Sequence, residues 1–375
     1  MRPSEGRLIV PATYDVVVVG GGPAGAATAL RLASTGRSVA LLERSHFDRP
    51  RVGETLAPAV RPLLHDLGVW DRFCALRSLP SWGTRSIWDE PDPAEHSHLA
   101  SGYASGWHVD RRAFDRMLAD AAAEAGADVL LGIGLVDCRY DDAAWNVVCS
   151  GEHRLAARLV VDATGRSAVL GRSLGARRLA FDRLVGITAY WQGVNVTDEQ
   201  YLLVESAADG WWYTAPLPGD AMVGMLMTDA DLCRRDGLTG AEAWHNRLQA
   251  TTATAERVGP RSPTSALRVH PAASQRTIRQ DDVRPWIAVG DAALSVDPVS
   301  GSGVPRALRT ADAAAETLAG LLDRPGEAAT LIARYESARD SECTTYLIDR
   351  ARYYSAVRRY PTPFWNRRQK QLVGN

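Results

Sequence analysis

A buried strand that runs directly into a glycine-rich turn is the feature that most limits how this chain can fold. Residues 14–20 (YDVVVVG) are β-branched and uninterrupted, as expected of a parallel strand covered on both faces. A helical pattern follows at 23–34, Gly36 ends it, and residues 38–42 (SVALL) form a second buried run. The chain therefore begins with a β-α-β unit.

The turn of this unit carries the pattern G-x-G-x-x-G at residues 20–25. Gly20 permits the tight turn, Gly22 lets a pyrophosphate approach the backbone, and Gly25 allows close packing of helix on strand. Glu43 ends the second strand, where a carboxylate can accept both ribose hydroxyls of an adenosine. The order of strand, turn, helix, strand and acid predicts a dinucleotide site with phosphate at the helix N-terminus.

Apolar spacing predicts the elements that follow. Residues 56–67 indicate a helix kinked at Pro62, and residues 111–125 indicate a helix capped by Asp110. Residues 180–230 alternate apolar and polar side chains and predict an antiparallel sheet that could roof a planar ligand. Further strands are expected at 129–131, 158–161 and 286–289, long helices at 306–322 and 327–352, and a loosely ordered, Arg-rich stretch over the last fifteen residues.

Short motifs also recur outside the glycine turn. The run 43–49 (ERSHFDR) is followed by 53–55 (GET) and Pro58. Asp110-Arg111 opens a helix, and 162–165 (DATG) forms an acidic turn. Residues 290–293 (GDAA) precede Asp297-Pro298 and the pair Gly301 and Gly303.

Together these motifs resemble those of flavoproteins related to geranylgeranyl reductases and flavin-dependent halogenases, a branch of the p-hydroxybenzoate hydroxylase-like fold. The resemblance implies FAD as the cofactor, with Arg111 near the pyrophosphate and Asp291 on the ribityl chain, although a turn acid is the alternative for Asp291. The expected cofactor-binding residues are Gly20, Gly22, Ala24, Gly25, Glu43, Arg44, Arg49, Glu54, Thr55, Arg111, Asp162, Gly165, Gly290, Asp291, Pro298, Gly301, Ser302 and Gly303.

The expected fold class is α/β, with a Rossmann-like FAD-binding domain interleaved with a mixed or antiparallel substrate-binding sheet and followed by C-terminal helices. The order of the patterns along the chain leaves no clean linker between the two domains. The predicted FAD-binding domain comprises 1–80, 104–180 and 266–322, the sheet domain 81–103 and 181–265, and the C-terminal helical segment with its basic tail 323–375.

Charge and cysteine content indicate which partners and which cellular compartment to expect for the chain. It has 43 Lys and Arg against 44 Asp and Glu, so a nucleic-acid partner is disfavoured. The five cysteines form no C-x-x-C pair, which favours a cytoplasmic protein without disulfides. No apolar run reaches the roughly 18 residues that span a bilayer. His96 and His98 lack a clear third ligand, so no metal site is expected.

Lysine usage bears on the reaction. Lys370 is the only lysine, and the resemblance implies that halogenases use a lysine beside the substrate. The stretch where it would fall reads 79–83 (LPSWG), and the halogenase pattern W-x-W-x-I-P is altered to 211–216 (WWYTAP). Halogenation is therefore the less favoured reading, and FAD-dependent hydroxylation of an aromatic substrate through a flavin C4a-hydroperoxide is the expected function.

The expected substrate is a small molecule or peptide with an indole or phenol ring, and the resemblance extends to flavoproteins that mature tryptophan-derived quinone cofactors. Tyr190, Trp211, Trp212 and Tyr213 form the predicted substrate wall, although strand aromatics are also typical of a core. His108 and Tyr213 are the candidate catalytic groups, with a structural role as the alternative for His108.

Other functions remain open from the sequence. A flavin-dependent reductase or dehydrogenase acting on a carbon–carbon bond is the main alternative, and a flavoprotein that only binds its substrate is another. NAD(P)H is expected to reduce the flavin either directly or through a separate flavin reductase. The single glycine fingerprint favours the second route.

Overall fold

The first sheet of the fold is built around the N-terminal strand. The computed structural model describes residues 12–90, 92–101, 105–141, 143–194, 200–281 and 284–369. Strand β1 (Ala12–Val19) pairs in parallel with β2 (Val39–Glu43) and β11 (Arg154–Asp162). Residues Val16–Val19 are buried because both faces of this sheet are covered. The sheet also contains β8 (Asp128–Leu131), β9 (Leu135–Asp141), β10 (Ala144–Cys149) and β19 (Trp286–Ala288).

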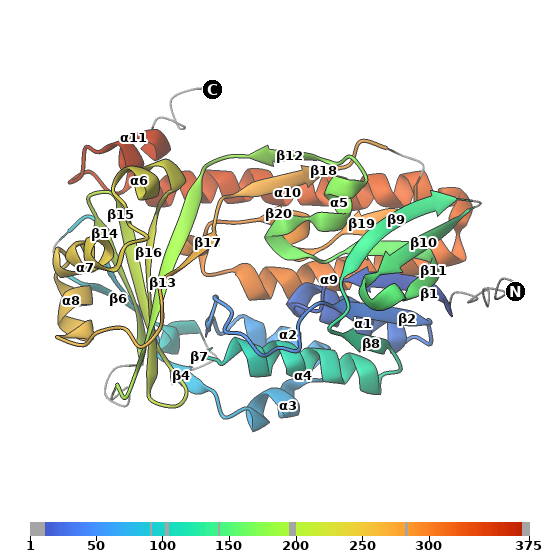
Figure 1. Ribbon diagram of the computed structural model, residues 1–375, viewed down its shortest axis with the longest axis horizontal. Coiled ribbons are helices and arrows are strands. Elements are labelled where there is room, and N and C mark those ends of the chain that lie inside the picture. The colour runs from blue at the N-terminus through green and yellow to red at the C-terminus, as the bar shows by residue number, and fades with distance from the viewer. Residues whose placement is uncertain are drawn as a thin grey trace, which may run out of the picture.

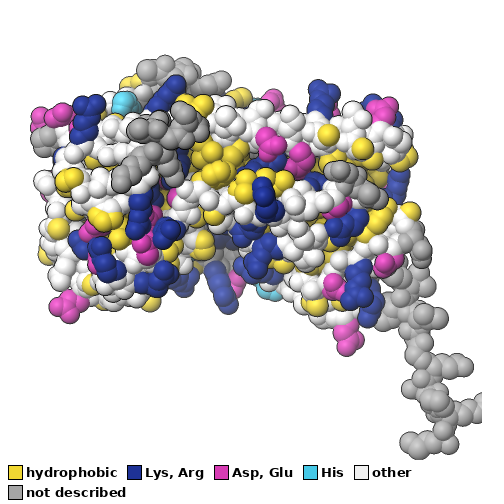
Figure 2. Space-filling model, turned by 90° about the horizontal axis from the view of Figure 1, so that it is seen from above, with side chains coloured by type: hydrophobic (Ala, Val, Ile, Leu, Met, Phe, Trp, Pro, Cys, Tyr) yellow, Lys and Arg dark blue, Asp and Glu magenta, His cyan; other side chains and the backbone are white. Residues whose placement is uncertain are grey.

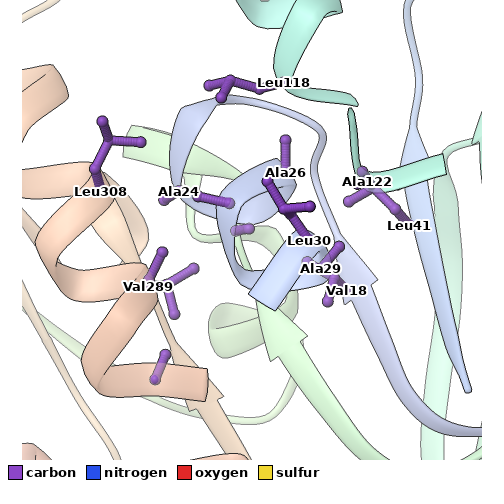
Figure 3. Close-up of a cluster of buried hydrophobic side chains, with 14 of the residues drawn as sticks. Val18, Ala24, Ala26, Ala29, Leu30, Leu41, Leu118, Ala122, Val289 and Leu308 are labelled. Atoms are coloured by element: carbon purple, nitrogen blue, oxygen red, sulfur yellow. The ribbon is translucent and has the colours of Figure 1, made fainter. Parts of the chain in front are cut away.

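Three helices cover one face of this sheet. The alanines of the first helix let its neighbours approach closely, and Ala26, Ala29 and Leu30 share a buried cluster with Val18 and Leu118 (Figure 3). The first helix thereby lies between the other two (Figure 1). The three helices are α1 (Pro23–Ala33), α4 (Arg111–Glu124) and α9 (Gly303–Asp323).

A second, largely antiparallel sheet forms the other half of the molecule (Figure 1). Three short helices cover its outer face, where Trp191, Trp212 and Trp244 pack in one apolar cluster. In spatial order its strands are β17 (Arg268–Pro271), β13 (Leu184–Gln192), β16 (Ala221–Asp229), β15 (Gly210–Leu217), β14 (Tyr201–Ala207), β5 (Gly83–Ile87) and β6 (Ala94–Ser97). The helices are α6 (Ala230–Arg235), α7 (Ala241–Gln249) and α8 (Ala253–Val258).

Two three-stranded sheets and three short helices complete the junction between the large sheets. The predicted kink at Pro62 is wrong, because α2 starts at Val60 and Pro62 therefore lies in its first turn, where no backbone N–H is needed. The small sheets are β3 (Thr55–Leu56), β7 (Gly106–His108) and β4 (Leu79–Ser81), and β12 (Arg177–Ala180), β18 (Gln275–Ile278) and β20 (Leu294–Ser295). The helices are α2 (Val60–Asp66), α3 (Trp70–Ala75) and α5 (Val169–Ser173).

The C-terminal helices pack against the rest of the chain. Helix α10 (Ala328–Ser355) runs across the top of the molecule in Figure 1, and α11 (Pro363–Gln369) follows it. The expectation of a loosely ordered end is wrong for α11, because Phe364 and Trp365 are fully buried. In the sequence these two apolar residues lie among several arginines, so the stretch was interpreted as a solvated charged segment. Lys370 lies outside the described residues.

The predicted fold class is confirmed, with a parallel α/β unit, a second sheet and C-terminal helices. The chain crosses between the two halves more than once, because β5 pairs with β14 although the two strands are far apart in sequence. Strand β17 pairs with β13, so the second sheet extends beyond the predicted limit at residue 265.

The surface mixes both charge signs. Basic side chains are spread over the face seen in Figure 2, with acidic ones among them. No helix among the described residues is both long and apolar enough to cross a membrane.

The packing of α11 gives a stability prediction. Replacing Arg368 by Ala should lower the free energy of unfolding by about 3 kcal/mol, because this buried arginine donates to the buried Asp229 carboxylate at 2.7 Å. Arg367 is the matched control, since it donates to Asp229 at 2.8 Å but its side chain is 40% exposed. Arg367→Ala should cost about 1 kcal/mol or less. Urea unfolding followed by circular dichroism measures both, and equal losses would contradict the prediction.

Candidate active site

One cavity of about 1290 Å³ lies between the carboxyl ends of the strands of the first sheet and the inner face of the second sheet. Pockets for a single small ligand usually hold roughly 300–1,000 Å³. The larger volume leaves room for a dinucleotide and a second molecule. The carboxyl edge of a parallel sheet is also where α/β proteins generally bind nucleotides.

The glycine turn after β1 forms one end of this cavity. A Cβ on Gly20 would come within 2.3 Å of the Ala163 carbonyl oxygen, and a Cβ on Gly25 within 1.9 Å of the Gly20 carbonyl oxygen. These two glycines are required by the protein's own packing. Gly22 differs, because its φ of −71° suits any residue and its Cβ would meet no protein atom within 4 Å. Since Gly22 lines the cavity, its open side fits a bound phosphate at the N-terminus of α1.

Glu43 lies beside this turn and also lines the cavity. Its Oε2 accepts the Gly21 N–H at 2.9 Å, and its Oε1 accepts the Ser45 hydroxyl at 2.7 Å and Arg51 Nη2 at 3.0 Å. Burial alone would raise the pKa of Glu43, but the Ser45 hydrogen bonds and the Arg51 charge outweigh it and the pKa lies below its ordinary value. The carboxylate is therefore charged and fixed where a ribose would lie.

A buried carboxylate holds two arginines at the cavity. Asp115 of α4 accepts Arg51 Nη1 at 2.9 Å and Arg111 Nε at 3.1 Å, and all three residues line the cavity. Arg44 lines it too. The prediction for Arg49 is wrong, because its side chain is 83% exposed and lies outside the cavity. Arg51 lines the cavity instead, and nothing in the spacing distinguished the two arginines.

The opposite wall comes from the acidic turn after β19 and from the start of α9. The Asp291 carboxylate lines the cavity and lies 3.4 Å from Arg166 Nε. Both Arg166 and Asp297 were missed by the sequence analysis as cavity residues. Gly303 and Val304, the first residues of α9, line the same space. The predicted residues that line this wall are Gly165, Asp291, Pro298, Gly301, Ser302 and Gly303.

Three further predicted cofactor residues, Gly25, Asp162 and Gly290, lie behind the cavity wall and not on it. The Asp162 carboxylate is buried and accepts the backbone N–H groups of Thr164 and Gly171 at 2.9 and 2.7 Å, which shapes the turn. A Cβ on Gly290 would meet Ala24 Cβ at 2.6 Å. These residues position the cavity-lining turns, so the prediction of direct cofactor contact is corrected for them.

The inner face of the second sheet lines the rest of the cavity. Trp211 and Tyr213 of β15 face the cavity, whereas Trp212 packs against Trp244 in the outer core at 4.9 Å between ring centroids. The prediction for Trp212 is therefore wrong, because successive strand residues point to opposite faces. Neighbouring strands add Thr84, Ser86, Gly186, Leu202, Val204, Met225 and Met227 to this chamber.

The buried Glu54 carboxylate forms a cluster with the two predicted tyrosines, which are half-buried. Tyr190 donates to Glu54 Oε1 at 3.0 Å and Tyr213 donates to Glu54 Oε2 at 3.1 Å. Burial raises the pKa of Glu54, and the tyrosine hydrogen bonds and Arg111 offset only part of this effect. Of the cluster only Tyr213 lines the cavity. The predictions of cofactor contact for Glu54 and substrate contact for Tyr190 are corrected accordingly.

His108 is a buried structural histidine and not a cavity residue. Its Nδ1 lies 3.0 Å from the Thr55 hydroxyl and its Nε2 lies 3.2 Å from the Gln200 carbonyl oxygen. Burial lowers its pKa to about 4, so the ring is neutral near pH 7. The prediction that His108 exchanges protons with the substrate is wrong, and its position fixes the cavity-lining Thr55 instead.

His96 and His98 line the far end of the cavity. Within the described ranges, no group of three or more His, Cys, Asp and Glu side chains is arranged to hold a metal ion.

Comparison with known proteins shows which protein family the chain belongs to. The sequence profile of the FAD binding domain family matches residues 13–349. The chain belongs to this family of FAD-dependent oxidoreductases. The LodB protein of Marinomonas mediterranea, whose name describes an FAD-dependent oxidoreductase, is 32% identical over 95% of this chain and 97% of its own length.

Two solved structures place this FAD-dependent oxidoreductase among related folds. The peptidyl tryptophan dihydroxylase QhpG, described as essential for tryptophylquinone cofactor biogenesis, is 27% identical with a TM-score of 0.78, over 96% of this chain and 79% of that one. The myxobacterial chondrochloren halogenase CndH has a TM-score of 0.87 at 23% identity, over 96% of this chain and 86% of that one. Because CndH is only 23% identical, its similarity shows a shared fold alone.

Gly22 offers a direct test of cofactor contact. Gly22→Val should abolish FAD retention without unfolding the protein, because a Cβ at this position meets no protein atom within 4 Å and would point into the space expected to hold the FAD pyrophosphate. Gly326 is the matched control, since its Cβ would also meet nothing within 4 Å and it lies outside the cavity. Bound FAD released by heat and quantified by absorbance measures the effect. Full occupancy in Gly22→Val would show that the turn is only structural.

Asp291 tests the opposite wall. Asp291→Ala should weaken FAD binding roughly ten- to a hundredfold, because a charge-assisted hydrogen bond is worth about 1.5–3 kcal/mol. Titration of the apoprotein with FAD by flavin fluorescence gives the affinity. Asp323 is the control, since it pairs with Arg37 on the surface away from the cavity. Unchanged affinity in Asp291→Ala would assign the residue a turn-forming role only.

Proposed function

We propose that this oxidoreductase is a monooxygenase that hydroxylates an aromatic ring, in particular the indole of a tryptophan carried by a peptide. The observation that carries the proposal is the continuity of one cavity from the glycine turn to the chamber under the second sheet. A ring in that chamber would lie against Trp211, Tyr213 and Met225. Such walls favour a flat apolar substrate beside the cofactor.

The residues of the site fit FAD, as the open side of Gly22 and the placement of Glu43 indicate. Bound FAD would supply the redox chemistry, with two electrons from the reductant. One oxygen atom of O₂ would be inserted at a ring carbon, which loses its hydrogen as a proton, and the other oxygen atom would be reduced to water. Arg51, Arg111 and Asp291 would hold the polar parts of FAD. The chamber residues would orient the ring and exclude water from the reacting atoms.

Lysine placement argues against halogenation as the main reaction. The described residues contain no lysine, so none of them supplies a side-chain amine to the chamber. In the stretch 79–83, where the halogenase resemblance places a lysine, the buried Ser81 hydroxyl has no hydrogen-bond partner among the described residues. The 27% identity to QhpG, which is named for the dihydroxylation of peptidyl tryptophan, supports hydroxylation instead.

The electrons would come from NAD(P)H through a separate flavin reductase. This part of the proposal rests on the single glycine fingerprint at residues 20–25. Reduction of bound flavin by NADPH alone, followed by absorbance in a stopped-flow instrument, should be slow, and addition of a flavin reductase should accelerate turnover.

Product mass tests the proposed reaction. The holoprotein, with FAD, NADPH, a flavin reductase, O₂ and bromide, should convert tryptophan-containing peptides into products that gain one or two oxygen masses. Reactions under ¹⁸O₂ should shift these products, because the inserted oxygen comes from O₂. No bromine isotope pattern is expected. Brominated products, or products formed equally well without O₂, would contradict the proposal and favour halogenation or carbon–carbon redox chemistry respectively.

A further inference from the structure

Hydroxylation of an aromatic ring releases a proton, and neither Tyr213 nor His108 is arranged to accept it. Tyr213 lines the chamber but donates its own proton to Glu54 at 3.1 Å, and His108 does not line the cavity. The Asp297 carboxylate does line it, but both of its oxygens accept hydrogen bonds from the protein. The proton acceptor in the chamber is therefore another residue.

His270 places an imidazole on the inner face of the second sheet. It belongs to β17 and lies directly opposite Gly186 of β13 in the antiparallel ladder, and residues opposed in this way share one face of a sheet. Both residues line the cavity. A Cβ on Gly186 would lie 2.4 Å from Met225 Sδ, so the imidazole shares this stretch of wall with a methionine. Sequence analysis missed His270 because a single histidine in a short strand carries no motif.

Strand β17 ends where the chamber meets the opposite wall of the cavity. The two residues that follow His270 also line the cavity, and the Ala273 carbonyl oxygen next along the chain accepts Arg166 Nη1 at 2.9 Å. Arg166 Nε in turn lies 3.4 Å from the Asp291 carboxylate. His270 therefore lies beside the junction at which a ring in the chamber would meet the cofactor.

The ring nitrogens of His270 are not used by the protein. Nε2 is buried without a hydrogen-bond partner, and Nδ1 forms no hydrogen bond with the described residues either. Burial and the positive charge of Arg268 lower the pKa of His270, so the ring is neutral near pH 7. A neutral imidazole has one N–H and one lone pair. With the proton on the enclosed Nε2, the lone pair of Nδ1 is left for a ligand.

We propose that His270 is a catalytic residue that accepts the proton released by the aromatic ring. This inference rests on the proposed function, in which a ring carbon gains an oxygen atom. Once the C–O bond has formed, the C–H bond at the same carbon breaks, its electron pair returns to the ring, and the proton moves to Nδ1. Burial and Arg268 disfavour the resulting imidazolium, so it passes the proton on to water and the neutral ring is restored.

Deuteration of the ring tests this step. The holoprotein, with FAD, NADPH, a flavin reductase and O₂, is given a tryptophan-containing peptide whose indole carbons carry either hydrogen or deuterium. In the wild type the two forms should react at the same rate, because transfer of the proton to His270 is fast. His270→Asn keeps a polar group near the position of Nδ1 but cannot take up the proton. Its turnover should fall about a hundredfold, and the deuterated peptide should react more slowly, because breaking the C–H bond then limits the rate.

His245→Asn is the matched control. His245 is exposed on α7, which covers the outer face of the same sheet, and lies outside the cavity, so turnover should be unchanged and no isotope effect should appear. His270→Ala should regain activity when imidazole is added, because free imidazole can occupy the vacated space and accept the proton. FAD affinity by flavin fluorescence and peptide affinity by calorimetry should stay near the wild-type values in His270→Asn, since the proton moves only during the reaction.

Several results would overturn the inference. Wild-type turnover in His270→Asn would do so, as would an isotope effect of equal size in the wild type and the variant. Lower turnover without an isotope effect, or without rescue of His270→Ala by imidazole, would show that His270 only shapes the wall. Each of these results, obtained with oxygenated product from the wild type, leaves the proposed function standing. Absence of oxygenated product from the wild type would instead contradict the proposed function, and the inference would fall with it.

Discussion

The close approach of α1 to β1 is the contact on which the site depends. A Cβ on Gly25 would lie 1.9 Å from the Gly20 carbonyl oxygen, and a Cβ on Gly20 would lie 2.3 Å from the Ala163 carbonyl oxygen. Without side chains at these two positions, the helix starts directly at the end of the strand, and its first residues Pro23 and Ala24 line the cavity. Gly290, which has no Cβ, then packs against the Ala24 side chain and brings the Asp291 turn against the same helix.

The second sheet contributes through the alternation of its strands. One face of β13, β15 and β16 carries the tryptophans that pack under α7, and the other carries the side chains that line the chamber. Gly186 shows how closely this inner face is fitted, because a Cβ there would lie 2.4 Å from Met225 Sδ. A flat ring in the chamber would therefore lie on a surface that is backed by the close-packed outer core.

The sequence predicted the β-α-β unit, the interleaved sheets and many of the residues that line the cavity, because each depends on local patterns of glycine, apolar spacing and strand order. Trp212 and His108 were misplaced for a different reason: the side of a strand that a residue faces, and the partners of a buried ring, depend on contacts distant in sequence. Arg51 could not be distinguished from Arg49, since the deciding partner Asp115 lies on another helix. The buried anchors of α11 were hidden by the arginines around them.

A hydrogen-bond chain joins the chamber under the second sheet to the opposite wall of the cavity through Tyr354 of α10. Trp211 Nε1 donates to the Tyr354 hydroxyl at 3.0 Å, and that hydroxyl donates to the buried Asp297 carboxylate at 2.7 Å. Asp297 lines the cavity beside the α9 loop, while Tyr354 belongs to α10 and packs against Trp365 of α11. Because a chain of buried hydrogen bonds is costly to break, it couples the Trp211 side of the chamber to the loop that carries Asp297. Helices α10 and α11 thus belong to the framework that holds the two walls of the cavity relative to each other.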